Sequence, residues 1–225
     1  MNRPDFSNYV VHFTSDRPPL AAKEVEEEWL KAISEMSAYD RLATILETCM
    51  IRATPMPWTN ATAVAFTECP WGSLLHHAGQ YSAYGVGFEK GRLFAAGGAP
   101  AIYLRPDLYN RQASHAKRGH GEDAMAFHSS LWPFVTPFVP AYAPKRMTDS
   151  HWKGRKVVDY THEREWRIPH DFSFKLSQVS FVVVDTYADV AKFPTEIKDA
   201  IGRDRFLIMD VYEQIERFWP THLHK

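Results

Sequence analysis

A segment that is apolar except for Ser180, VSFVVV at residues 179–184, constrains the fold of this chain more than any other feature of its sequence. A strand with one face in water alternates apolar and polar side chains, whereas an unbroken run of β-branched and aromatic residues is typical of a strand covered on both faces. The segment FLIM at 206–209 is a second candidate for such a buried strand. The sequence therefore predicts a sheet whose apolar strands have other elements packed against both faces.

The rest of the pattern mixes short strands with peripheral helices. Strands are predicted at 9–14, 63–67, 84–88, 93–95, 101–104 and 165–168. Helices are predicted at 21–36, 40–51, 71–78 and 211–218, with Asp40 as the N-cap of the second helix and a polar, helical insertion at 109–127. The prolines of 132–144 argue against either regular element there. Because strands and helices do not alternate as regular βαβ units, we expect an α+β fold.

Length and composition set the class of protein. A chain of 225 residues predicts one domain, 1–225, with a proline-rich and polar insertion at about 105–156. The net charge of -1 provides no overall field to attract nucleic acid or an anionic membrane. No apolar run approaches the roughly 20 residues of a membrane span. Two cysteines and no leader-like N-terminus indicate a cytoplasmic protein with reduced thiols.

The segment VDYTHEREWRIP at 158–169 carries the most chemistry. In a strand, Glu163, Glu165 and Arg167 would share one face, while Trp166 and Ile168 would lie on the other. Two carboxylates and a guanidinium would then face the same space. The structural alternative is a surface strand with Glu–Arg pairs to its neighbours.

Three stretches, in this order, resemble the AbiGi type of bacterial abortive-infection proteins and a related family of uncharacterised proteins. They are YVVHFT at 9–14, FTECPWGSLLHHAGQYSAYGVGFEKGRLF at 66–94 and YTHEREWRIP at 160–169. The similarity covers about half of the chain, and EREWR is the most specific of its elements. It implies a role in phage defence.

A histidine, a tyrosine and a glutamate on successive strands are also similar to the H-Y-E arrangement of ADP-ribosyltransferases, in which two opposed sheets hold NAD. This resemblance implies an ADP-ribosyltransferase-like fold of split mixed β-sheets with peripheral helices. It makes Glu165 the catalytic carboxylate and Glu163 a second catalytic residue. The residues it implies for NAD binding are His12, Thr14, Tyr81, Tyr84 and Arg167, with one of the two tyrosines stacking on nicotinamide.

The implied reaction suits these residue types. Breaking the bond between nicotinamide and ribose develops positive charge on the sugar, which a carboxylate such as Glu165 can stabilise. A neutral ring nitrogen of His12 can hydrogen-bond a ribose hydroxyl. Glu163 can act as the general base that accepts a proton from the incoming acceptor.

The acceptor and the class of function stay open at this point. Between 105 and 156, nine basic residues outnumber four acidic ones and are interleaved with aromatic residues, which favours nucleic acid over protein as the acceptor. With water as the acceptor, the protein is an NAD glycohydrolase. In a different class, it is a non-catalytic, antitoxin-like component that binds another defence protein. The eleven histidines show no metal-binding spacing, and Gly97-Gly98 is a weak candidate for a phosphate-binding turn.

Overall fold

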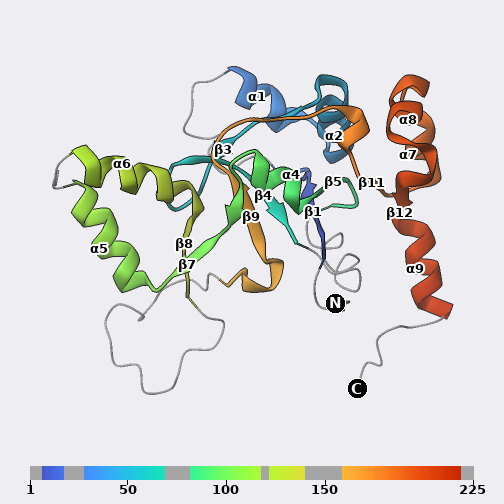
Figure 1. The fold of residues 1–225 in the computed structure, drawn as a ribbon. Helices are drawn as coiled ribbons and strands as arrows, with labels where there is room; N and C mark the ends of the chain where they lie inside the picture. The colour runs from blue at the N-terminus through green and yellow to red at the C-terminus, as the bar shows by residue number, and fades with distance from the viewer. Residues whose placement is uncertain (1–6, 18–27, 69–81, 118–121, 140–158, 219–225) are drawn as a thin grey trace.

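The fold is that of a computed structural model, which describes residues 7–17, 28–68, 82–117, 122–139 and 159–218 (Figure 1). Its largest element is an eight-stranded mixed sheet with the order β12-β11-β5-β1-β4-β9-β6 and with β3 paired to β4. The strands are β1 (Tyr9–Phe13), β3 (Thr54–Pro55), β4 (Thr62–Thr67), β5 (Gly85–Glu89), β6 (Ala99–Pro100), β9 (Glu165–Ile168), β11 (Phe181–Val184) and β12 (Phe206–Ile208). The expected α+β class is confirmed.

The apolar run identified first forms β11, next to the edge strand β12. β11 pairs antiparallel with β5 and parallel with β12, and Val182, Val183 and Val184 are fully buried. The parallel connection runs through α7 (Tyr187–Lys192) and α8 (Thr195–Ile201), two short helices that the sequence pattern did not reveal. The prediction of a strand buried on both faces is therefore confirmed.

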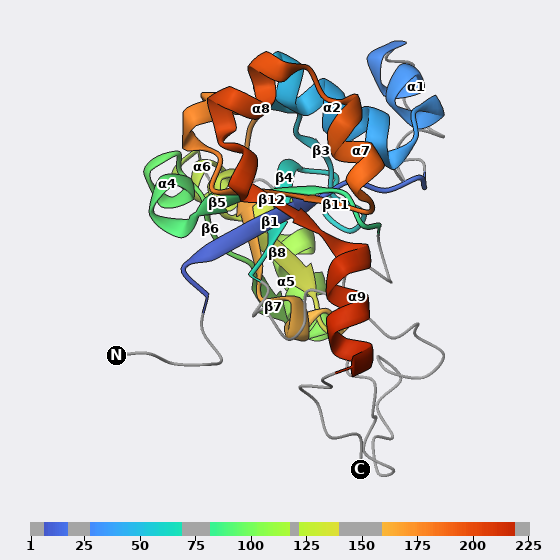
Figure 2. The ribbon, with the colours of Figure 1, turned by 90° about the vertical axis from the view of Figure 1, so that its right-hand side faces the viewer.

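Helices cover the sheet on one side, and Figure 2 shows α2, α7 and α8 there. Helix α2 (Ala38–Thr48) buries Leu42 and Leu46 against the sheet at three- to four-residue spacing. The core beneath contains Phe66, Phe88 and Phe172, whose rings meet edge to face. Helix α9 (Met209–Phe218) follows β12 and extends past the opposite side of the sheet.

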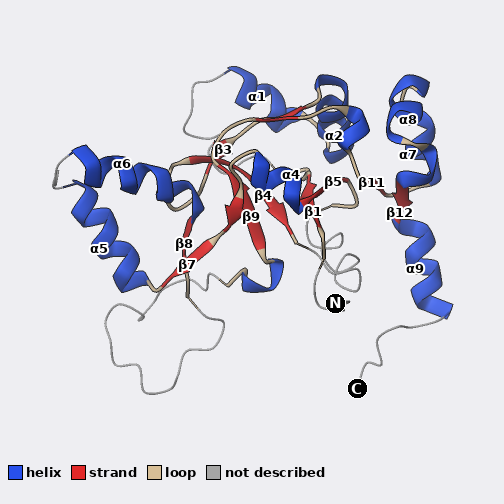
Figure 3. Cartoon of the chain, in the orientation of Figure 1, coloured by secondary structure: helices blue, strands red, loops and turns tan. Residues whose placement is uncertain are grey.

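A second group of elements lies on the side of the molecule away from α7, α8 and α9 (Figure 3). It contains the parallel pair β7 (Ile102–Leu104) and β8 (Val135–Pro137), connected through α5 (Pro106–Lys117), α6 (Glu122–Leu131) and the 3₁₀ turn η2 (Trp132–Phe134). The prediction that 132–144 holds no regular element is wrong for β8. Its one proline, Pro137, is tolerated because it ends a strand of only three residues that pairs on one side with β7.

Other boundaries differ from prediction for local reasons. The N-cap of α2 is Ser37, whose hydroxyl accepts from the Asp40 amide, so Asp40 lies inside the first turn. The predicted strand at 93–95 is part of helix α4 (Lys90–Ala95). The remaining described elements are α1 (Glu28–Glu35), the pair β2 (Met50–Ile51) and β10 (Phe172–Ser173), and the 3₁₀ turns η3 (Thr161–Glu163), η4 (Leu176–Gln178) and η5 (Arg203–Arg205). The helix predicted at 71–78 lies outside the described residues.

Among the helices that the structure describes, none combines the length and apolarity needed to cross a membrane.

Candidate functional site

The candidate site lies where the sheet splits between β1 and β4. β1 pairs with β5 along all five of its residues, but its register with β4 is the single pair Val11 and Thr67. Continuing that register would set His12 opposite Phe66 and Phe13 opposite Ala65, but these pairs are absent, and the side chain of His12 meets the Ala65 carbonyl oxygen at 2.8 Å. An imidazole thus replaces backbone pairing at the split.

His12 is held in its neutral form. Burial lowers its pKa, and the hydrogen bond to Ala65 opposes this only in part. In neutral imidazole one nitrogen donates and the other accepts. Because a carbonyl can only accept, Nδ1 carries the proton, and Nε2 is left as an acceptor.

Glu165 and Arg167 form a two-pronged ion pair on one face of β9. Arg167 Nε lies 2.8 Å from Glu165 Oε1, and Arg167 Nη2 lies 2.9 Å from Oε2. The guanidinium is only 1% exposed and also donates to the carbonyls of Pro133 and Val135 and to the Thr136 hydroxyl. It therefore ties β9 to the η2–β8 segment and occupies both carboxylate oxygens of Glu165.

Glu163 does not share that strand face, contrary to the prediction. It ends η3, and Arg164 between the two glutamates has a φ of 46°, in the left-handed region that turns the chain before β9 begins. Glu163 is nevertheless buried, at 7% exposure, with the His162 imidazole 4.0 Å away.

One cavity of about 350 Å³ brings several of the predicted residues together, and we call it the acidic cavity. Its lining includes His12, Glu163, Glu165 and Arg167, with Trp58 and Tyr160 among its aromatic residues. Next to it, the Tyr103 hydroxyl lies 3.0 Å from the Tyr160 carbonyl and 3.5 Å from Glu165 Oε2. Burial and the Glu165 charge raise the pKa of Tyr103, so its hydroxyl stays protonated and donates. Nothing in its segment, AIYL, distinguished Tyr103 beforehand.

Tyr84, one of the two tyrosines predicted to stack on nicotinamide, does not line this cavity. The Tyr84 hydroxyl donates to Asp189 at 3.1 Å, and its ring meets Tyr39 edge to face. Hydrogen bonds from Lys192, Thr186 and Tyr84 outweigh the effect of burial and lower the pKa of Asp189 to about 2, so this carboxylate is a charged acceptor at neutral pH. Tyr81 lies outside the described residues.

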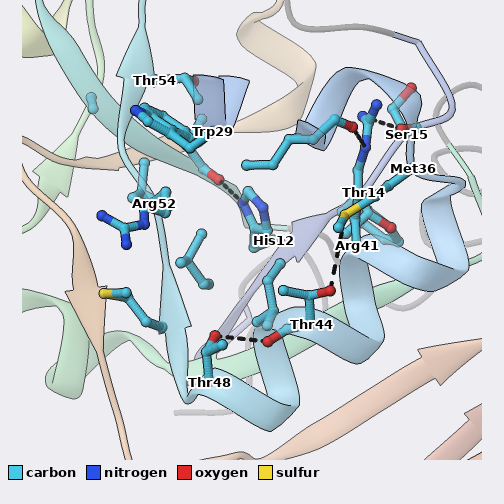
Figure 4. Close-up of a pocket in the computed structure, with 18 of the residues that line it drawn as sticks. His12, Thr14, Ser15, Trp29, Met36, Arg41, Thr44, Thr48, Arg52 and Thr54 are labelled. Atoms are coloured by element: carbon cyan, nitrogen blue, oxygen red, sulfur yellow. Dashed lines mark hydrogen bonds between the residues drawn. The ribbon is translucent and has the colours of Figure 1, made fainter. Parts of the chain in front are cut away.

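Thr14 is buried, and its hydroxyl lies 2.7 Å from the Ala38 carbonyl and 3.2 Å from that of Tyr84. It also lines a second cavity of about 500 Å³, which we call the arginine cavity (Figure 4). The two cavities share His12, Phe13, Met56 and Ala65. The two cavities therefore adjoin at the split in the sheet, where His12 lines both of them.

The candidate phosphate-binding turn at Gly97-Gly98 has a structural explanation. The amides of Gly97 and Gly98 donate to Phe94 and Leu93 at the end of α4, so they close a helix and do not form an anion nest. Across the residues that the structure describes, no group of three or more potential metal-ligating side chains occurs.

Comparison with known proteins identifies a family. The family model described as "Putative abortive phage resistance protein AbiGi, antitoxin" matches residues 51–195, which is more than half of the chain. The match includes Glu163, Glu165 and Arg167 but not β1, which carries His12. No curated protein and no solved structure gives a significant match.

Proposed function

Because this chain belongs to the AbiGi family of abortive phage-resistance proteins, we propose that it is a non-catalytic, antitoxin-like component of a phage-defence system. In this role it binds a partner protein of the same system and restrains the partner's toxicity. The family description supplies the class of function, and the chemistry of the Glu165 site supports it.

The observation that carries the proposal is the Glu165–Arg167 pair. A carboxylate that stabilises charge on a sugar must present its own charge to the substrate. Both Glu165 oxygens instead meet the Arg167 guanidinium at 2.8 and 2.9 Å, and that guanidinium is buried against three further acceptors. Such a pair links strands and fixes β8, which is a structural task.

The placement of Tyr84 supports the same conclusion. The H-Y-E resemblance implies that Tyr81 or Tyr84 stacks on nicotinamide beside the histidine and the glutamate, and of these two only Tyr84 lies within the described residues. Tyr84 is instead engaged with Asp189 and Tyr39, away from the acidic cavity. The described part of the chain therefore brings together a histidine and two glutamates without the predicted Tyr84.

One observation favours a second candidate, an NAD-dependent ADP-ribosyltransferase. His12, Glu163 and Glu165 line a single cavity although they come from β1, η3 and β9. In this function the cavity holds NAD, and the acceptor is a nucleic acid, a protein or, in a glycohydrolase, water. The second function requires the ion pair between Glu165 and Arg167 to break when NAD binds.

One experiment with two readouts tests both functions. The protein is expressed together with the toxin of its defence system, and growth rescue and complex formation are measured by dilution plating and by size-exclusion chromatography with light scattering. The purified protein is also incubated with labelled NAD and separate pools of DNA, RNA and cell protein.

The proposed function predicts growth rescue and a stable complex, with neither nicotinamide release nor label transfer. Glu165→Gln provides the internal control, since it removes the carboxylate charge while keeping the side-chain shape. Nicotinamide release by the wild type that Glu165→Gln abolishes at unchanged fold would overturn the antitoxin proposal and establish the enzyme.

A further inference from the structure

We propose that the arginine cavity binds a small amphipathic anion, with an apolar body and one carboxylate or phosphate head group. This cavity lies between α1, α2 and the strands β1, β2 and β4 (Figure 4). Its volume of about 500 Å³ falls within the roughly 300–1,000 Å³ of small-molecule sites. The inference concerns a ligand and is independent of the partner proposed above.

The walls of the cavity are mainly apolar. Both helices and the strands contribute side chains such as Trp29, Ile33, Met36, Ile45, Met50 and Met56. A pocket that is mostly apolar with a few placed polar groups is the common form of a small-molecule site. The apolar body of the ligand packs against these side chains.

The charged groups that line the cavity in the described part of the chain are all of one sign. They are Arg17, Arg41 and Arg52, and none of the described lining residues is an aspartate or glutamate. Arg52 lies 5.8 Å from the centre of the Trp29 ring and makes a 3.5 Å ion pair with Asp171 outside the cavity. Asp16 acts electrostatically on Arg41 but does not line the cavity. A ligand with a negative head group complements this lining.

Arg41 carries a buried donor that lacks a partner among the described residues. Its Nε donates to the Ile33 carbonyl at 3.0 Å, and its Nη1 donates to the carbonyls of Ser15 and Arg17. These bonds hold the guanidinium in place at the wall between α1, α2 and the end of β1. Its Nη2 is buried and has no hydrogen-bond partner in the described part of the chain.

A buried donor without an acceptor is unfavourable, so this atom calls for a partner. An oxygen of a carboxylate or phosphate group supplies one and adds charge assistance. Because the guanidinium is already fixed by three carbonyls, little side-chain entropy is lost when the anion binds. His12 at the same cavity is neutral and adds no charge to the three arginines.

The test is isothermal titration calorimetry on the full chain with four probes of equal chain length. Decanoate and decyl phosphate carry the two candidate head groups, decanol is uncharged and decylamine is cationic. We expect saturable binding of at least one anion with one site per chain, at least tenfold weaker binding of decanol, and none of decylamine. Comparison of the two anions identifies the head group. Equal affinities for decanol and the better anion, or no saturable binding of either anion, would overturn the proposal.

Substitutions in and outside the arginine cavity test whether the anion binds there. Thr44→Phe fills the cavity from α2 and should abolish binding of the better anion, whereas Glu47→Phe, on the exposed side of the same helix, should leave it unchanged. Arg41→Met should weaken anion binding at least tenfold and leave decanol binding unchanged, with circular dichroism as the check of folding. Arg203→Met, at an exposed arginine outside the cavity, is its matched control. Anion binding that survives Thr44→Phe in a folded variant contradicts the assignment.

Discussion

The two cavities that His12 lines differ in whether their charged side chains have partners within the fold. In the acidic cavity, Glu165 meets a guanidinium that belongs to the same wall, so its charge is compensated within the fold. In the arginine cavity, Arg41 is fixed by neutral carbonyls and keeps one buried donor without a partner in the described chain. Glu165 and Arg167 therefore stabilise the fold, whereas Arg41 is the residue that we propose binds a ligand.

The largest effect on stability is expected from a substitution that breaks the Glu165–Arg167 ion pair. Arg167→Met leaves the Glu165 carboxylate without its guanidinium and three acceptors of the η2–β8 segment without their donor. Removal of one member of a buried ion pair costs about 3–5 kcal/mol. We therefore expect the free energy of unfolding, measured by urea titration, to fall by that amount.

The pair itself can be isolated with a double-mutant cycle. Glu165→Gln alone should also destabilise, and the double variant should lose less than the sum of the two by about 1–3 kcal/mol, because the residues act through each other. Additive losses would show that Arg167 works through its other acceptors alone. A fully stable Glu165→Gln variant would return this carboxylate to the catalytic hypothesis.

A smaller loss of stability is expected from substitution of Arg41 in the arginine cavity. Arg41→Met removes charged hydrogen bonds to three carbonyls but leaves no carboxylate unpaired within the cavity lining. We expect a loss of about 2 kcal/mol, since hydrogen bonds to charged groups contribute roughly that much and water can replace part of the interaction at this half-buried position. Thermal unfolding with and without the better anion measures it, and the anion should raise the melting temperature of the wild type only. A loss as large as that of Arg167→Met would mean that the two cavities do not differ in this respect.

The smallest effect should be the pH dependence contributed by His12. Burial lowers its pKa below the ordinary value of 6.5, so the unfolded chain binds a proton at a higher pH than the folded chain does. The stabilisation is complete above about pH 6.5 and decreases as the pH falls from there toward the lowered pKa. His12→Gln keeps an amide donor for Ala65 but does not titrate. The difference in unfolding free energy between wild type and this variant, followed from pH 8 to pH 5, should therefore shrink toward acid. A constant difference contradicts the neutral state of His12.

Predictions from the sequence were most accurate for elements whose apolar pattern lies within a single segment. The run at 179–184, the apolar spacing of α2 and the alternation of β9 each reflect local periodicity, and each element is present. The segment at 93–95 failed because three apolar residues fit a helix as well as a strand. Helices α7 and α8 were missed because they are short and depend on packing against the sheet more than on a long apolar stripe.

The site was predictable only in part. Glu165 and Arg167 share a face, as alternation requires, but the acceptors of Arg167 lie 31 to 34 residues away, and no pattern links them to it. The left-handed conformation of Arg164, a residue without special freedom there, displaced Glu163 from the strand. The partnership of Tyr84 with Asp189 spans 105 residues and depends on the packing of α7. Long-range polar partners of this kind are properties of the tertiary structure.

The single backbone pair between β1 and β4 also has a consequence for how the molecule opens. On one side of it, β1, β5, β11 and β12 form a continuous ladder; on the other, β4, β9 and β6 form a second. In backbone hydrogen bonding, separating the two ladders disrupts a single strand pair, together with the His12 hydrogen bond and side-chain contacts such as Phe66–Phe88, whereas opening either ladder disrupts several strand pairs. Amide hydrogen exchange should therefore resolve two cooperative units, with the boundary between them at His12.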